Sequence, residues 1–402
     1  MTKPEYILIL DAHPVDDGRI QKHIRFLQDR GSTVYHIHFI PYGSNPSVED
    51  GRYSLFGEKS WHVNLHWKIR YKGLRLLNYI PLFSSRLARH TIDAIQTLEV
   101  PFAAKGIIHV HDPILLPLAK KIQGKWLVNA KIVYDRHEVY EDMKRFGGFG
   151  GYRLFEHIAG NSVSGVVVVS DLHKKAVTGF FPKALVTTVP NFPMAAFVDQ
   201  KTVLDKIHSF AQTTPIICIY IGSLRQYLDR DIDLLLILAD AILTEISAAR
   251  FFIGGTCDDA GVERKLDLLQ QKFKSRFTYL GPVPYDQVIQ KTENAHIGFY
   301  LVKPDTGYWV PCSPNKIFEY LSCGVIPVIR ADCDFKDEMR SCGLFFARNT
   351  SEAVIIDSVI SLLKNPEEMK SRMELCLKIA SNFAYENVSD RYRLLYETII
   401  EK

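Results

Sequence analysis

The stretch that decides the fold covers residues 311–328 and reads Pro-Cys-Ser-Pro-Asn-Lys-Ile-Phe-Glu-Tyr-Leu-Ser-Cys-Gly-Val-Ile-Pro-Val. A serine before a proline predicts a helix start. Ser313 would cap the free amide groups, and Pro314 suits the first helical position because the N–H group that it lacks would have no partner there. Gly324 is placed to end the helix, and the apolar residues 325–329 predict a buried strand after it. A helix N-terminus at such a strand–helix junction favours phosphate binding.

Two charged residues of this helix extend the prediction. Lys316 adds a cation to the first turn, and Glu319 lies about one turn further on, where it would accept hydrogen bonds from sugar or ribose hydroxyls. The sequence therefore predicts a nucleotide-sugar pocket around this helix.

Apolar strand-like runs alternate with helical patterns along the whole chain, which predicts an α/β protein with two doubly wound Rossmann-like domains. We expect one domain over residues 1–195, a second over 196–381, and an amphipathic helix over 382–402 that returns to the first domain. A polar stretch that we expect to be poorly ordered continues to about Gln212 after the domain junction. Neither half carries Gly-x-Gly-x-x-Gly after a strand, so a nicotinamide or flavin cofactor has no support.

The helix motif resembles the donor-site signature of glycosyltransferase family 4, the retaining GT-B enzymes, in particular those of bacterial cell-surface polysaccharide synthesis. The resemblance rests on Ser313-Pro314-Asn315-Lys316 followed by Glu319. It implies that Glu319 binds the ribose, while Ser313, Asn315 and Lys316 line the donor pocket. The family pattern has two Glu residues separated by seven positions, and Glu319 matches the second. The first, which commonly contacts the transferred sugar, would fall at position 311, where this chain has Pro311.

Further segments resemble the same family in the N-terminal half. A His-Asp-Pro step contains His111 and Asp112, and an Asp-x-His-Glu step contains His137. The loop that follows the first strand ends at Gly18, where a glycine suits close approach of backbone to ligand. The resemblance implies that His111, Asp112 and His137 orient the sugar or the acceptor as the catalytic residues.

In the C-terminal half, Gly222 ends a strand that resembles the family segment before the two cations that grip the donor diphosphate. Arg230 occupies the position of the family's lysine, and Ser223 replaces the family's arginine, whose charge we expect Arg225 to supply. An arginine fork suits this task because it binds two phosphate oxygens at once. Gly255 follows another strand and resembles the segment that contacts the base.

The resemblance implies transfer of a sugar, with retention, from a nucleotide-diphosphate donor, expected to be a UDP-sugar, to a hydroxyl of a glycan or lipid-linked acceptor in surface polysaccharide or glycoconjugate synthesis. It also implies a GT-B architecture of two domains facing a cleft. Two other functions remain open. One is a nucleotide-sugar 2-epimerase on the same fold, and the other is a catalytically silent GT-B binding protein, which the replacement at Pro311 makes conceivable.

Charge and cysteine content limit the classes of binding partner that we expect. The net charge of +4 is mild and comes with no nucleic-acid signature, and the seven cysteines match neither a zinc motif nor a disulfide framework. Three histidines and three carboxylates follow the N-terminal strands, but family 4 enzymes need no metal, so we expect no metal and no cofactor. Residues 61–90 carry six Lys/Arg interleaved with Trp and Tyr, which predicts peripheral contact with an anionic inner membrane surface. We expect a cytoplasmic protein with no apolar run long enough to cross a bilayer.

Overall fold

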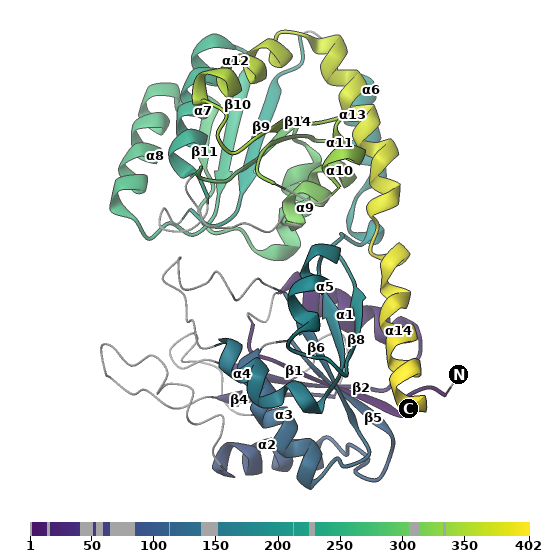
Figure 1. The fold of residues 1–402 in the computed structure, drawn as a ribbon. Helices are drawn as coiled ribbons and strands as arrows, with labels where there is room; N and C mark the ends of the chain where they lie inside the picture. Colours follow the sequence, from purple (N-terminus) through teal and green to yellow (C-terminus); the bar gives the residue numbers. More distant parts are fainter. Residues whose placement is uncertain are drawn as a thin grey trace. The chain divides into compact units, whose positions relative to one another are not determined.

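The computed structural model describes residues 2–13, 17–40, 51–53, 59–64, 85–111, 113–137, 152–211, 213–224, 230–304, 314–332 and 335–402. The chain forms two compact units (Figure 1). Unit 1 comprises Met1–Pro190 and Val388–Lys402, and unit 2 comprises Asn191–Asn387. The sequence places the corresponding boundaries near residues 195 and 382.

Within the described residues, unit 1 has an eight-stranded sheet in the order β3-β4-β2-β1-β5-β6-β7-β8. The β3–β4 pair is antiparallel, and the other neighbouring strands in this sheet run parallel. The strands are β1 (Tyr6–Asp11), β2 (Val34–Ile40), β3 (Gly51–Tyr53), β4 (Lys59–Asn64), β5 (Gly106–Val110), β6 (Lys131–Arg136), β7 (Val163–Val168) and β8 (Leu185–Thr188). All six residues of β1 and all five of β5 are buried, as in a sheet covered on both faces.

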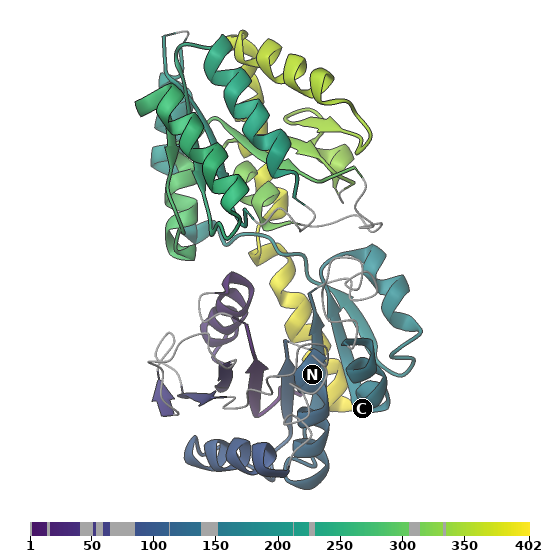
Figure 2. The same ribbon diagram turned by 90° about the vertical axis from the view of Figure 1, so that its left-hand side faces the viewer.

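Helices cover this sheet, and the last helix of the chain is one of them. The helices of unit 1 are α1 (Gly18–Asp29), α2 (Ser85–Thr97), α3 (Leu116–Lys125), α4 (Tyr152–Ala159), α5 (Asp171–Thr178) and α14 (Glu386–Glu401). Figures 1 and 2 both show α14, in yellow, alongside the strands of unit 1. A Cβ atom built on Gly165 of β7 would meet the Leu395 side chain at 3.2 Å, so this glycine lets α14 approach the sheet closely.

Unit 2 has a six-stranded parallel sheet within the described residues, in the order β11-β10-β9-β12-β13-β14. Its strands are β9 (Ile216–Ile221), β10 (Ala249–Gly254), β11 (Phe277–Tyr279), β12 (Ile297–Leu301), β13 (Ile326–Arg330) and β14 (Leu344–Phe346). Its helices are α6 (Gln200–Ser209), α7 (Ile232–Glu245), α8 (Ala260–Phe273), α9 (Tyr285–Glu293), α10 (Asn315–Ser322), α11 (Lys336–Met339), α12 (Glu352–Leu363) and α13 (Pro366–Ala380).

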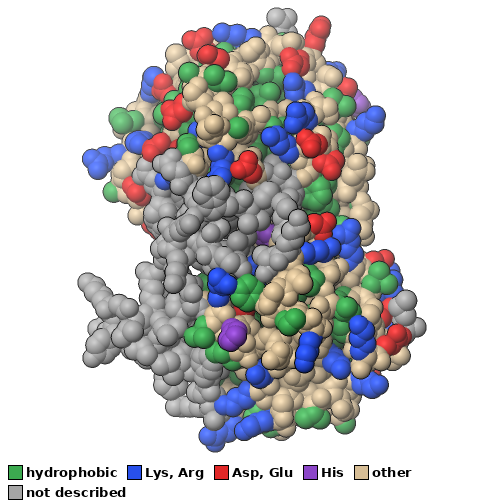
Figure 3. Space-filling model, in the orientation of Figure 1, with side chains coloured by type: hydrophobic (Ala, Val, Ile, Leu, Met, Phe, Trp, Pro, Cys, Tyr) green, Lys and Arg blue, Asp and Glu red, His purple; other side chains and the backbone are tan. Residues whose placement is uncertain are grey.

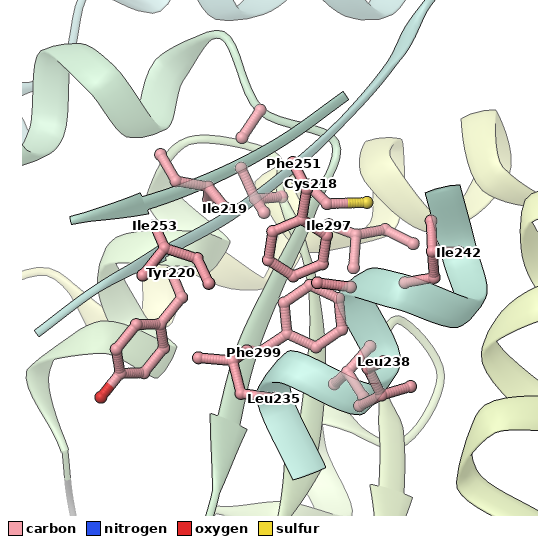
Figure 4. Close-up of a cluster of buried hydrophobic side chains, with 14 of the residues drawn as sticks. Cys218, Ile219, Tyr220, Leu235, Leu238, Ile242, Phe251, Ile253, Ile297 and Phe299 are labelled. Carbon is pink, nitrogen blue, oxygen red and sulfur yellow. The ribbon is translucent and has the colours of Figure 1, made fainter. Parts of the chain in front are cut away.

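The core of unit 2 forms where α7 packs on the sheet. Leu235, Leu238 and Ile242 of α7 point toward the central strands in Figure 4 and are fully or almost fully buried. Phe251 of β10 and Phe299 of β12 lie opposite them, stacked with ring centroids 5.2 Å apart. On the outer face drawn in Figure 3, Lys/Arg and Asp/Glu side chains of unit 2 are interspersed, as is usual for a solvated surface.

The predicted fold class is confirmed, since both units alternate strands and helices around largely parallel sheets and α14 returns to unit 1. One expectation is wrong. The stretch up to Gln212, expected to be poorly ordered, contains α6, whose first amides are capped by the Asp199 carboxylate and which buries Val203 and Ile207. No helix in the described part of the chain is long and apolar enough to span a membrane.

Candidate functional site

Each sheet has a point at which the strand order reverses, and ligands of such sheets bind beyond the carboxyl ends of the strands at this point. In unit 1 the reversal lies between β1 and β5, and in unit 2 it lies between β9 and β12. Most of the predicted site residues that the structure describes lie at or near these edges.

Two predicted glycines meet at the edge of unit 2. Gly222 follows β9, and Gly255 follows β10 with φ of +145°, a conformation that side chains disfavour. A Cβ atom on Gly255 would lie 1.8 Å from the carbonyl oxygen of Gly222, so a side chain cannot be accommodated there without a backbone shift. The Gly255 amide donates to the Gly281 carbonyl at 2.7 Å, which fixes the turn. At Gly222 and Gly255 the backbone therefore lines this edge of the sheet without side chains.

Lys316 comes to the same place from the first turn of α10. Its Nζ atom lies 5.6 Å from the ring centroid of Tyr220, over the ring, a cation–π contact. A Cβ atom built on Gly222 would lie 2.5 Å from this Nζ atom. The predicted residues Gly222, Gly255 and Lys316 are thus brought together, with an ammonium group against the backbone that follows β9.

Helix α10 itself is firmly anchored. It begins at Asn315, one residue after Pro314, and Ser313 lies outside the described residues. At its other end Gly324 has φ of +59°, and the Val325 amide donates to the Tyr320 carbonyl at 2.8 Å, which closes a Schellman motif. This ending matches the helix stop predicted at Gly324.

The buried face of α10 carries Phe318, which packs against an aromatic cluster of Phe192, Phe335 and Phe383 at centroid distances of 4.7 to 5.9 Å. Glu319 follows and is only 6% exposed. A carboxylate buried to this degree needs polar partners.

A second cation lies near the neighbouring strand. The guanidinium group of Arg230 lies over the Tyr300 ring at 4.5 Å, and Arg230 pairs with Val302 in an isolated β-bridge. The next residue, Asp231, caps α7 and forms a buried ion pair with Arg330 at the end of β13. Arg225 lies outside the described residues.

The edge of unit 1 centres on a buried ion pair. Asp135, near the end of β6, accepts hydrogen bonds from Nε and Nη2 of Arg19 in α1, the latter at 2.8 Å. The Tyr392 hydroxyl of α14 donates to its Oδ2 atom at 2.8 Å. Arg19 also donates to the Val189 carbonyl at 3.0 Å. The carboxylate therefore accepts hydrogen bonds from two helices.

Four imidazole rings surround this carboxylate, and we call His23, His109, His111 and His137 the histidine cluster. His111 Nδ1 lies 3.0 Å from His137 Nε2, and His111 Nε2 lies 3.1 Å from His23 Nδ1. The Tyr396 hydroxyl of α14 lies 2.8 Å from His23 Nε2 and 2.8 Å from His109 Nδ1. The structure thus brings the predicted His111 and His137 together, and Asp112 lies outside the described residues.

Burial sets the charge state of these groups. Desolvation lowers the pKa values of His23, His109, His111 and His137, so the four rings are neutral near pH 7. Burial acts to raise the pKa of Asp135, but the Arg19 guanidinium and the imidazoles outweigh it and hold the pKa well below its usual range. His137 is 11% exposed, whereas His23, His109 and His111 are fully buried.

Two sets of described residues have donor atoms close enough to share a metal ion: His23, His109 and His111, and His111, Asp135 and His137. Neutral imidazoles suit zinc and similar ions. However, the Asp135 carboxylate is already engaged by Arg19 and Tyr392, and the hydrogen bonds described above occupy most of the ring nitrogens. The expectation of a metal-free site stays a prediction.

Gly18 begins α1, directly after Asp17, whose carboxylate accepts from the amides of Arg19 and Ile20. Gly18 is thus in the turn that aims Arg19 at Asp135. In the same region Asp11 is buried and paired with His36 on the adjacent strand.

Sequence reasoning missed several members of this site. Arg19 belongs to a loop segment that resembles family 4, whereas His23 was not recognised. His23 lies four residues after Arg19 on the face of α1 that carries the buried apolar residues, and this spacing was the available signal. Tyr392 and Tyr396 were recognised only as part of an apolar helix face, although buried tyrosine hydroxyls normally find a partner.

Known proteins resemble this chain in structure but not detectably in sequence. No protein-family model and no curated protein matches it. Solved structures do match. A sucrose-phosphate synthase from Thermosynechococcus elongatus is 12% identical, with a TM-score of 0.74 over 98% of this chain and 99% of that one. A UDP-forming α,α-trehalose-phosphate synthase from Burkholderia vietnamiensis is 11% identical, with a TM-score of 0.69 over 98% and 100%.

This chain has the GT-B glycosyltransferase fold. A further match is an Escherichia coli structure described as trehalose-6-phosphate bound with UDP-2-fluoro glucose, at 10% identity and a TM-score of 0.68 over 98% and 99% of the two chains. At such low identity the likeness establishes the fold alone. The GT-B fold agrees with the resemblance to family 4, but these neighbours are synthases of sugar phosphates rather than enzymes of surface polysaccharide synthesis.

Proposed function

We propose that this protein is a GT-B glycosyltransferase that moves a sugar from a nucleotide diphosphate to a hydroxyl group. One observation carries the proposal. The ammonium group of Lys316 lies against the bare backbone at Gly222, at the strand-order reversal of unit 2 and in the first turn of α10. A cation, a glycine and a helix N-terminus at one sheet edge together favour a diphosphate.

Each predicted donor-site residue would have a part in the transfer. Lys316 and the N-terminus of α10 stabilise the negative charge that develops on the departing diphosphate, with Arg225 and Arg230 as additional cations. Glu319 holds the ribose, and the backbone at Gly255 approaches the base. Ser313 and Asn315 complete the proposed donor pocket.

In unit 1, His137 and, through it, His111 would orient a hydroxyl of the sugar or acceptor, and the resemblance to family 4 implies the same role for Asp112. Retention of configuration would follow if the acceptor attacked from the face that the diphosphate leaves. One of the similar structures comes from a study of glycosyltransfer with retention by trehalose-6-phosphate synthase, which supports this stereochemistry.

For the donor base we propose uracil, because two of the similar structures are described as UDP-forming or bound to a UDP-sugar analogue. For the acceptor we propose a glycan, a lipid-linked sugar or a sugar phosphate. The predicted membrane contact through residues 61–90 falls largely on residues 65–84, which lie outside the described residues. Binding to anionic liposomes that is lost when Lys68, Arg70, Lys72 and Arg75 are neutralised would support that contact.

The test is a donor screen by ligand-induced melting shift. UDP and UDP-sugars should raise the melting temperature of the wild type and lose this effect in Lys316→Ala and Glu319→Ala. Lys272→Ala is the matched control, because this lysine of unit 2 is half-exposed and pairs with Asp240 on the surface. A screen in which no nucleotide diphosphate stabilises the wild type would refute the proposal.

A second assay separates the remaining functions. Release of UDP that depends on an added acceptor supports transfer, and interconversion of two UDP-sugars without acceptor identifies a 2-epimerase. Tight binding with neither reaction identifies a silent binding protein, the alternative suggested by Pro311.

A further inference from the structure

Four hydrogen bonds link the histidine cluster and Tyr396 in a row, and the two ends of the row face the Asp135 carboxylate, which closes a loop. Starting at Asp135, the loop runs through His109, the Tyr396 hydroxyl, His23, His111 and His137, and returns to Asp135. Four of its contacts are 2.8 to 3.1 Å long. The two contacts that close the loop at the carboxylate are longer, 3.7 Å from His109 Nε2 to Oδ2 and 3.5 Å from His137 Nε2 to Oδ1. His111 Nδ1 also faces the carboxylate, 3.7 Å from Oδ2.

The proton positions in this loop follow from one starting condition. Asp135 is ionised, so the ring nitrogen of His109 that faces it should carry hydrogen, since a bare lone pair would be repelled. That nitrogen, Nε2, makes no hydrogen bond to any described residue, and the carboxylate is the acceptor within reach. A neutral ring carries one hydrogen, so Nδ1 of His109 must be an acceptor.

The remaining assignments then follow around the loop. Tyr396 donates its single hydrogen to His109 Nδ1 and can only accept from His23, which therefore carries hydrogen on Nε2. His23 Nδ1 is then an acceptor, so His111 carries hydrogen on Nε2 and accepts at Nδ1. His137, as the donor to that atom, carries hydrogen on Nε2, which also faces the Asp135 carboxylate. This arrangement points two N–H groups and one bare nitrogen, His111 Nδ1, at the carboxylate, whereas the reverse arrangement would point one N–H group and two bare nitrogens at it.

We propose that the Tyr396 hydroxyl sets the tautomers of His111 and His137 through His23, and so determines which ring nitrogen of His137 accepts a hydrogen bond from a ligand. The tautomer assignment stands independently, and its value to catalysis rests on the proposed function. Tyr396 is a positioning residue, because it acts through other side chains. His137 Nδ1 becomes the acceptor nitrogen at the exposed end of the loop, suited to a sugar or acceptor hydroxyl.

The direct test is nitrogen NMR of the whole chain labelled with ¹⁵N-histidine, which distinguishes Nδ1–H, Nε2–H and doubly protonated rings. The chain has 14 histidines, so the signals are assigned by single substitutions. In the wild type at pH 7.5 we expect the Nε2–H tautomer for all four members of the histidine cluster. Nδ1–H at His111 or His137 would overturn the proposal without any variant.

The variant Tyr396→Phe cuts the loop while keeping the ring. His23 Nε2–H then loses its acceptor, and the tautomer ratio of His23, His111 and His137 should move toward Nδ1–H by at least roughly fivefold, the effect of one lost buried hydrogen bond. Tyr392→Phe is the matched control, because it removes a buried hydroxyl one turn away that contacts Asp135 but belongs to no link of the loop. It should keep the wild-type tautomers.

An unchanged pattern in Tyr396→Phe, or an equal change in both variants, would refute the role of Tyr396. Kinetics give a separate readout if the proposed transfer occurs. Tyr396→Phe should lower kcat and leave KM for the nucleotide sugar unchanged, because the proposed nucleotide contacts lie in unit 2. Since the NMR result needs no substrate, it stands or falls independently of the glycosyltransferase proposal.

Discussion

Replacing Gly222 by alanine should abolish most nucleotide binding while leaving the fold intact. The added methyl group would lie 2.5 Å from Nζ and 2.6 Å from Cε of Lys316, and 3.2 Å from the Tyr220 hydroxyl. The closest atoms are the far end of a flexible side chain, which can swing away. Gly222 also lacks the positive φ that marks Gly255. We therefore expect the free energy of unfolding to change by less than about 1 kcal/mol.

Binding should respond much more strongly, because a displaced Lys316 cannot meet the diphosphate. A hydrogen bond to a charged group contributes about 1.5–3 kcal/mol, so the Kd for UDP should rise roughly 10- to 150-fold. Isothermal titration calorimetry measures the Kd, and urea unfolding measures the stability. Gly124→Ala serves as the control, because a methyl group there, in α3 of unit 1, meets no atom within 4 Å. UDP binding by Gly222→Ala at wild-type strength would refute the placement of the donor.

Three further predictions concern stability. Gly255→Ala should lower the free energy of unfolding by more than about 2 kcal/mol, because its methyl group meets backbone at a strained φ; urea unfolding close to that of Gly222→Ala would contradict this. Leu395→Ala should cost about 2–4 kcal/mol through the cavity left between α14 and β7, and a melting temperature near that of the wild type would argue against this packing. The lowered histidine pKa values mean that the unfolded chain binds more protons below pH 6.5, so stability should fall on acidification. Between pH 7.5 and 5.5, each buried neutral ring should lower the free energy of unfolding by up to about 1.4 kcal/mol. A melting temperature that does not change over this pH range would contradict the prediction.

The strands that are buried along their whole length were predictable from sequence. The pattern of residues 216–221 predicts a strand with the bounds that the structure has, because a run of apolar, mostly β-branched residues bounded by turn signals has few alternatives. Leu185–Thr188 and Leu344–Phe346 were not predicted. Both are short, partly exposed edge strands, so hydrophobic pattern marks them poorly. Helix α6 was overlooked because few of its residues are buried, although Asp199 was a readable cap.

The candidate site was predictable only where residues follow strands directly. Carboxyl ends of parallel strands share one edge, so the proximity of His111 and His137 followed from their positions after two adjacent strands. The contacts of Tyr396 with His23 and His109 join three distant segments, and no local pattern indicates them. The functional roles of Lys316, Glu319 and the other proposed donor-site residues stay predictions.

The position of α14 affects how the protein is made. Leu395 and the two tyrosines complete the interior of unit 1, yet the ribosome adds them only after all of unit 2. A nascent chain of residues 1–190 therefore has an uncovered strip over β7 and a buried aspartate that lacks one of its donors. During translation unit 1 therefore stays incomplete while about 200 further residues are added, which takes some 10–40 s at usual elongation rates. That interval is when chaperones would be needed.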